Sequence, residues 1–128
     1  MPTARRVAAI EAMNPLFARL FAPRCFPARA RGSDAWLDGV CFMWWDLLPI
    51  HGLANEDPIR EACLDVLART LALDALACQE SALHGLGHWQ HCAPSRVSSM
   101  IDAYLVRDPS APSETRDYAR AAREGRVP

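Results

Sequence analysis

Three of the four histidines of this chain lie close together in one short segment. His84, His88 and His91 follow one another at intervals of four and three residues, and Glu80 precedes His84 by four. In a helix, positions three or four residues apart share a face, so these side chains form one stripe. Imidazole and carboxylate groups bind Zn²⁺ and other divalent transition metals. The stripe is therefore a candidate metal site.

Two interpretations of this stripe remain open. As a metal site the stripe needs a ligand from a second element, because one helix supplies its ligands along a line. His51 is the only other histidine that could serve. The thermolysin-type zinc motif is excluded, since Gly85 stands where that motif requires glutamate. The same spacing is also typical of a solvated helix face. A metal-binding protein or metal-dependent hydrolase is thus one candidate function, without an assigned catalytic residue.

The helix that carries the stripe is predicted over residues 75–92. Its small and apolar residues are expected on the side opposite the histidines, so the stripe is predicted to face outward. Gly85 and Gly87 fall inside this helix, where glycine is unfavourable and is accepted when another backbone must approach closely. We expect Gly85 to contact a neighbouring helix and Gly87 to leave space beside the histidines.

A second candidate surface is aromatic. A helix is predicted from Ser33-Asp34 to Leu48, before Pro49, with a wide apolar arc. Phe42 and Trp45 lie off this arc, with Met43 near them. These three residues either line an apolar pocket or a homodimer face, or help to fill the core. The first alternative favours a non-enzymatic interaction module that binds a protein partner, a second copy of itself or a small apolar ligand.

The remaining pattern predicts an all-α fold of six to seven helices packed as antiparallel pairs. Helical periodicity dominates and strand alternation is absent. The other helices are expected over residues 3–13, 16–22, 58–73, 96–107 and from 113 onward. Asn14-Pro15 reads as a cap followed by a first-turn proline. One domain of 128 residues is expected, with a flexible end at about 125–128.

The segment Ala82-Leu83-His84-Gly85-Leu86-Gly87 resembles the inner helix of a HEAT-type repeat. The resemblance spans about residues 57–107 and includes a faint echo between residues 60–64 and 79–83. It implies stacked antiparallel helix pairs and a binding surface in the second half, and it carries over no catalytic residues.

The composition limits the classes of partner that we expect this chain to bind. The formal net charge is −1 and all fourteen basic residues are arginines, so no basic field points to nucleic acid. No segment has the ~20 apolar residues of a membrane span, and no secretory signal is visible, which makes the cytoplasm the expected location. The five cysteines contain no CxxC pair, and Cys63 and Cys78 are expected to pack in the core.

Overall fold

The computed structural model describes residues 1–27, 36–48 and 53–128, and every element within these ranges is helical. This confirms the predicted all-α class. The elements are α1 (Thr3–Glu11), α2 (Met13–Pro15), the π-helical η1 (Leu16–Phe21), α3 (Ala22–Arg24), α4 (Trp36–Phe42), the 3₁₀ turn η2 (Trp44–Leu47), α6 (Asp57–Leu71), α7 (Leu76–Trp89), α8 (Pro94–Arg107) and α9 (Ser113–Arg123).

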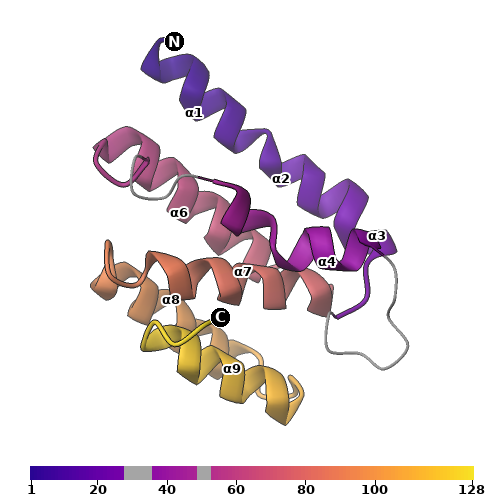
Figure 1. Ribbon diagram of the computed structural model, residues 1–128. Helices are drawn as coiled ribbons and strands as arrows, with labels where there is room; N and C mark the ends of the chain where they lie inside the picture. Colours follow the sequence, from indigo (N-terminus) through magenta and orange to yellow (C-terminus); the bar gives the residue numbers. More distant parts are fainter. Residues whose placement is uncertain (28–35, 49–52) are drawn as a thin grey trace.

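The elements run back and forth across the molecule. In Figure 1, α1, α2, η1 and α3 form one long rod, and α6 to α9 follow as antiparallel neighbours. Helix α7 contacts α4, η2, α6, α8 and α9, so it lies at the centre. The antiparallel arrangement agrees with the prediction, while the closer likeness to a HEAT repeat stays a prediction. No described helix has the length and apolar character needed to cross a bilayer.

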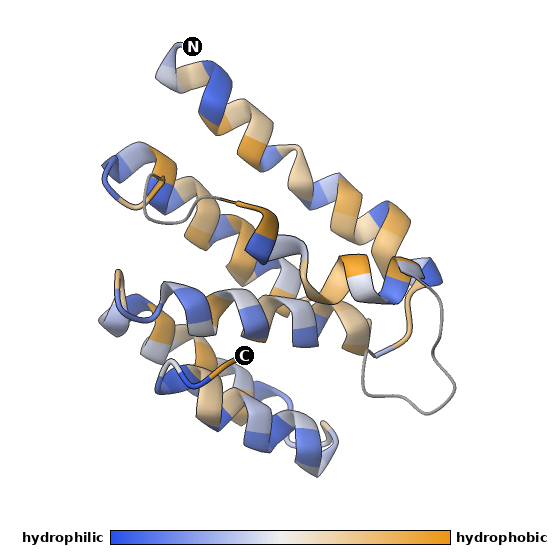
Figure 2. Ribbon diagram, viewed as in Figure 1, coloured by the Kyte–Doolittle hydropathy of each residue, from blue (hydrophilic) through white to orange (hydrophobic). Residues whose placement is uncertain are grey.

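The first rod continues through the point where a break was predicted. Within the described residues, the side-chain oxygen of Asn14 accepts no hydrogen bond, and the backbone at Pro15 keeps helical angles. Proline has no N–H, so the regular hydrogen-bond ladder cannot pass through it unchanged, and a π-helical stretch follows. This stretch buries Phe17 and Phe21 against the centre of the molecule. Figure 2 shows that the rod is mainly hydrophobic along η1, whereas α9 is mainly hydrophilic.

The helix predicted to extend to Leu48 is shorter. Its expected start at Ser33-Asp34 and its expected stop at Pro49 fall outside the described residues. Helix α4 ends at Phe42, and the chain continues through Met43 into a 3₁₀ turn. This change of helix type rotates the residues that follow, so Trp45 is fully buried while Leu47 is 69% exposed. The predicted apolar arc is therefore wrong beyond Phe42, and also at Trp36, which is 77% exposed.

Helix α7 is buried around almost its whole circumference. All residues from Ala77 to Gly87 are buried, including Glu80 and His84. The prediction that the histidine stripe faces outward is wrong for these two residues, because helices cover α7 on every side. A helix made of small and apolar residues, with few charges, is typical of such a central position.

The chain forms a defined turn after α9. The N–H of Gly125 bonds to the carbonyl of Ala122, and the N–H of Arg126 bonds to that of Ala121. These two bonds form a Schellman motif, which requires the positive φ of 75° that Gly125 adopts. The turn directs Val127 onto Gly87, whose missing side chain provides the space. Gly87 therefore accommodates the chain end rather than opening space beside the histidines.

Candidate metal centre

Three side-chain donors converge beside the middle of α7. The Nε2 atom of His84 lies 3.1 Å from Asp46 Oδ2, and the Nε2 atom of His88 lies 2.8 Å from Asp46 Oδ1. The two Nε2 atoms are 3.2 Å apart. Within the described residues, this is the group of three or more His, Cys, Asp and Glu side chains whose donor atoms lie close enough to share one ion.

Two elements supply the three donors. His84 and His88 are one turn apart on α7, so their side chains project from the same face. Asp46 comes from η2, the 3₁₀ turn that packs on α7. The second element therefore overcomes the limitation that one helix places its ligands along a line.

The centre connects the interior with the surface. His84 is completely buried, whereas the side chains of His88 and Asp46 are 30% and 27% exposed. An ion from solvent can therefore reach the donors from the Asp46 and His88 side. The buried His84 provides a fixed anchor.

Further residues hold the buried imidazole in place. The Tyr118 hydroxyl lies 2.8 Å from His84 Nδ1, on the side of the ring away from Asp46. The Phe42 ring packs on the imidazole with its centroid 4.6 Å away. Burial lowers the pKa of His84, although Asp46 acts in the opposite direction. The neutral imidazole favoured by burial is the form that binds metal ions.

The geometry is compatible with two chemical states. In one, both imidazoles donate their Nε2–H groups to the same carboxylate, and two N–H groups then face each other across 3.2 Å. In the other, one ion replaces both hydrogens. Tetrahedral zinc with bonds of ~2.0–2.1 Å places its ligand atoms about 3.3 Å apart. The separation of the two imidazole nitrogens, 3.2 Å, is close to that edge length.

The second state also agrees with the hydrogen bond at the far side of His84. If Nε2 faces an ion, the ring hydrogen resides on Nδ1 and is donated to the Tyr118 oxygen. Such outer hydrogen bonds are usual for metal-bound histidines, since they fix the tautomer and the orientation of the ring. Tyr118 lies on α9, so this bond links a third element to the centre.

The structure brings together only part of the predicted stripe. His84 and His88 belong to the centre, but His91 and Glu80 do not. His91 lies beyond the last residue of α7, and its Nε2 atom is 3.2 Å from Cys92 Sγ. Because α7 ends at Trp89, these two neighbouring side chains are no longer held apart by helical geometry and converge.

Glu80 has a different place. Its carboxylate is buried one turn before His84 and accepts a hydrogen bond from the Thr115 hydroxyl at 3.3 Å. Asp46 is the donor that sequence reasoning missed. The indication in the sequence is weak, because a helix that continues to Leu48 does not predict that Asp46 points toward the histidines. His51, the other candidate ligand, lies outside the described residues.

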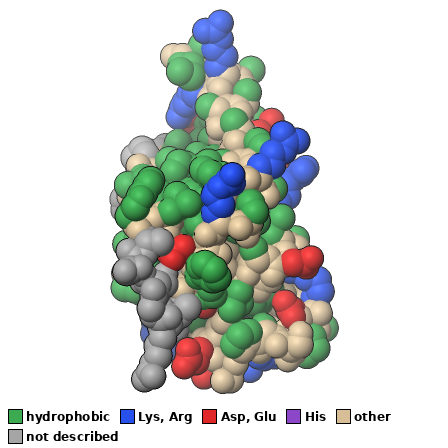
Figure 3. Space-filling model, turned by 90° about the vertical axis from the view of Figure 1, so that its right-hand side faces the viewer, with side chains coloured by type: hydrophobic (Ala, Val, Ile, Leu, Met, Phe, Trp, Pro, Cys, Tyr) green, Lys and Arg blue, Asp and Glu red, His purple; other side chains and the backbone are tan. Residues whose placement is uncertain are grey.

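The predicted aromatic face does not exist as a free surface. Trp45 is fully buried and stacks on Phe17, with ring centroids 6.1 Å apart. Phe42 is half-buried against His84, and only Met43 is exposed. Of the two open interpretations, core packing is correct for Trp45. The exposed aromatic side chains are others: Phe26, which follows α3, and Trp36, which begins α4. Figure 3 shows hydrophobic side chains gathered on one face of the molecule.

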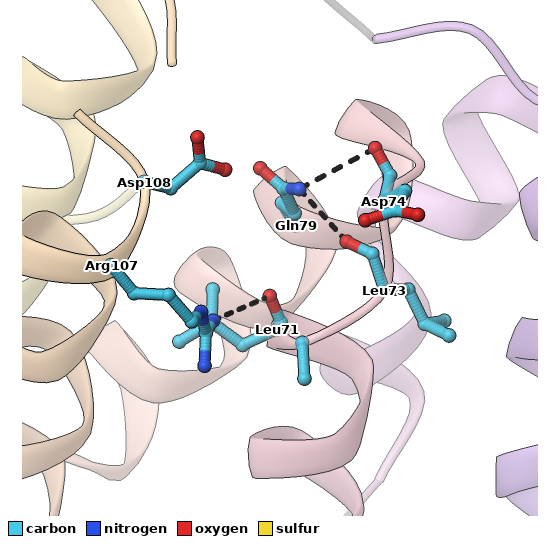
Figure 4. Close-up of a pocket in the computed structure, with 7 residues that line it drawn as sticks. Leu71, Leu73, Asp74, Gln79, Arg107 and Asp108 are labelled. Atoms are coloured by element: carbon cyan, nitrogen blue, oxygen red, sulfur yellow. Dashed lines mark hydrogen bonds between the residues drawn. The ribbon is translucent and has the colours of Figure 1, made fainter. Parts of the chain in front are cut away.

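A polar hollow of about 270 Å³ lies at the turn between α6 and α7, away from the histidines. The Gln79 amide nitrogen donates to the carbonyls of Leu73 and Asp74, and Arg107 donates to the carbonyl of Leu71 (Figure 4). The Gln79 oxygen accepts from the Tyr104 hydroxyl at 2.9 Å. These hydrogen bonds satisfy backbone carbonyl groups at the C-terminal end of α6 and in the following turn. The polar groups of the hollow therefore stabilise the fold.

Comparisons of the chain with known protein families, with curated proteins and with solved structures find no match.

Proposed function

We propose that this protein binds one divalent transition metal ion through His84, His88 and Asp46, and that Zn²⁺ is the ion the donor set fits best. The observation that carries the proposal is the mutual approach of two imidazole nitrogens and one carboxylate within 3.2 Å. A two-histidine, one-carboxylate set is a common ligand set of zinc, and it leaves a further coordination position open.

Burial and electrostatics support the same proposal. One ligand is buried, and the other two are partly exposed, which provides both a rigid anchor and an entry path. The carboxylate offsets part of the charge of the ion. Tyr118 supplies the outer hydrogen bond that a metal-bound His84 requires.

A titration of chelator-treated protein tests the proposal. Calorimetry with Zn²⁺, and visible absorption with Co²⁺ as a spectroscopic substitute, are expected to show one ion per chain. Addition of Zn²⁺ at a hundred times its dissociation constant is expected to stabilise the fold by about 2.7 kcal/mol. If the protein takes up no metal and melts at the same temperature with and without Zn²⁺, the proposal is wrong. The three residues then form only a hydrogen-bonded network.

The variant pair His88→Ala and His91→Ala provides a matched control. Both histidines lie near the end of α7 and neither is fully buried, but only His88 belongs to the centre. His88→Ala is expected to weaken Zn²⁺ binding by more than about a hundredfold, since even outer hydrogen-bond partners contribute ~10–100-fold. His91→Ala is expected to bind as the wild type does. Equal affinities of the two variants would contradict the assignment.

A further inference from the structure

One thiol of this chain lies directly beside an imidazole, outside the metal centre. The Cys92 Sγ atom is 3.2 Å from the His91 Nε2 atom, which is hydrogen-bonding distance for a thiol and a ring nitrogen. Both residues belong to the turn between α7, which ends at Trp89, and α8, which begins at Pro94. His91 is exposed and Cys92 is half-buried, so the pair lies at the surface.

The backbone of the turn holds the two side chains in this position. The N–H groups of Cys92 and Ala93 both bond to the carbonyl of Trp89, each at 3.0 Å. Trp89 itself is fully buried, so the turn is attached to the core. A thiol and a base held within hydrogen-bonding distance form the arrangement in which a cysteine becomes an effective nucleophile.

The other four cysteines have different surroundings. Cys25 is half-buried like Cys92, but its thiol lies 3.7 Å from the carbonyl of Leu37, and burial raises its pKa. A carbonyl oxygen accepts a hydrogen bond and leaves the proton on sulfur, whereas a neutral imidazole can take the proton. Accessibility and a neighbouring imidazole therefore coincide at Cys92. The remaining three cysteines are fully buried: Cys41, Cys63 and Cys78.

The start of α8 favours negative charge on the sulfur. Cys92 directly precedes Ala93, the N-cap residue of α8, whose methyl group cannot cap the helix. The N–H groups in the first turn of a helix carry partial positive charge. Cysteines at such helix ends are more reactive, because the thiolate is the attacking species.

We propose that Cys92 is a site of thiol–disulfide exchange with disulfides of low molecular weight, and that His91 is its general base. The Cys92 sulfur attacks one sulfur of the small disulfide while the thiol proton passes to His91 Nε2. One sulfur–sulfur bond forms on Cys92 as that of the small disulfide breaks, and the released thiolate takes the proton from the imidazole. The small disulfide is the oxidant. The products are one mixed disulfide and one small thiol.

The test is the reaction of reduced, chelator-treated, full-length protein with oxidised glutathione at pH 7. Samples are quenched by alkylation, and peptide mass mapping measures the mixed disulfide at each cysteine over time. In the wild type, Cys92 is expected to react faster than Cys25. An ordinary thiol is only a few per cent ionised at pH 7, so His91→Ala is expected to slow the reaction at Cys92 by about tenfold.

Two controls separate base catalysis from a change in access to the thiol. His88→Ala removes an imidazole of the proposed metal centre and is expected to leave the rate at Cys92 unchanged. Free imidazole in the buffer is expected to accelerate the reaction of His91→Ala more than that of the wild type, because it replaces the missing base. The proposal is overturned if Cys25 reacts as fast as Cys92, if His91→Ala reacts as the wild type does, or if imidazole accelerates both proteins equally.

Discussion

The indole of Trp45 packs directly on the backbone of Gly85. A Cβ atom placed on Gly85 would lie 2.7 Å from the indole Cγ, and the same distance from Leu67 Cδ2. Real Cβ atoms do not approach carbon so closely, so only glycine allows η2 to settle on α7 in this way. Because Asp46 follows Trp45 directly, this contact also positions the carboxylate opposite His84 and His88. Gly85 therefore contributes to the proposed metal centre, because it allows the packing of Trp45 that positions Asp46.

Gly85→Ala is expected to destabilise the fold by about 1–3 kcal/mol through overpacking. Because the substitution pushes Trp45 outward, Asp46 moves with it, and Zn²⁺ affinity is expected to fall as well. Denaturant unfolding and calorimetric titration measure the two effects.

The control for this substitution is Gly39→Ala. Nothing lies within 4 Å of a Cβ atom at Gly39, which is also in a helix. Alanine is expected to stabilise that position by up to ~1 kcal/mol. If both variants change stability by the same amount and in the same direction, close packing at Gly85 is not the cause.

Tyr118→Phe removes the hydroxyl that contacts His84 Nδ1 and changes nothing else at the centre. We expect Zn²⁺ affinity to fall by about 10–100-fold with the stoichiometry unchanged, since the imidazole loses its orienting partner. Calorimetric titration measures both quantities.

Tyr104→Phe is the matched control for that experiment. Tyr104 is also buried, but its hydroxyl donates to Gln79, which is not one of the proposed metal ligands. Its replacement is expected to lower stability by about 1 kcal/mol and to leave Zn²⁺ affinity as it is. An unchanged affinity in Tyr118→Phe would mean that the hydroxyl does not orient the ligand.

Trp45→Ala is expected to cost about 3–5 kcal/mol of unfolding free energy, because a fully buried indole leaves a cavity. The oligomeric state, followed by light scattering, is expected to be that of the wild type wherever the variant folds. Trp36→Ala is the comparison, since Trp36 is 77% exposed and its loss is expected to change stability by less than ~0.5 kcal/mol. A shift in oligomeric state caused by Trp45→Ala alone would instead support a homodimer that depends on Trp45.

Stability is expected to decrease at alkaline pH because of Tyr104. Burial raises the pKa of its phenol to about 12, from an ordinary value of 10.0. Below pH 10 the phenol is protonated in both the folded and the unfolded chain, and its contribution is fully present. Between pH 10 and 12 the unfolded chain releases the proton while the folded chain retains it, so folding loses free energy as pH rises.

Urea unfolding as a function of pH checks this expectation. The buried Cys63 thiol, whose pKa is raised to about 11, contributes in the same direction. Tyr104→Phe is therefore expected to reduce the slope of stability against pH above pH 10 without abolishing it. An identical slope in the variant would show that the phenol does not carry the effect.

Several features could be predicted from local sequence. Helix α6 was expected over 58–73 and spans Asp57–Leu71, and α8 was expected over 96–107 and spans Pro94–Arg107. In both cases periodic apolar residues and a proline in the first turn act within a few residues, so the signal is local. The contact at Gly85 was also predicted, because glycine is unfavourable inside a helix and is accepted where a close approach requires it.

By itself, the sequence determined the helical class, most helix positions, and the alignment of His84 with His88 on one face of α7. These properties depend on intervals of three or four residues, which a helix fixes whatever surrounds it. Only the tertiary structure decided that His84 is buried, that His91 and Glu80 lie outside the centre, and that Asp46 completes it. Those outcomes depend on which helices cover α7 and on the change of helix type at Met43. Both arise from contacts between residues far apart in the chain, about which local spacing contains no information.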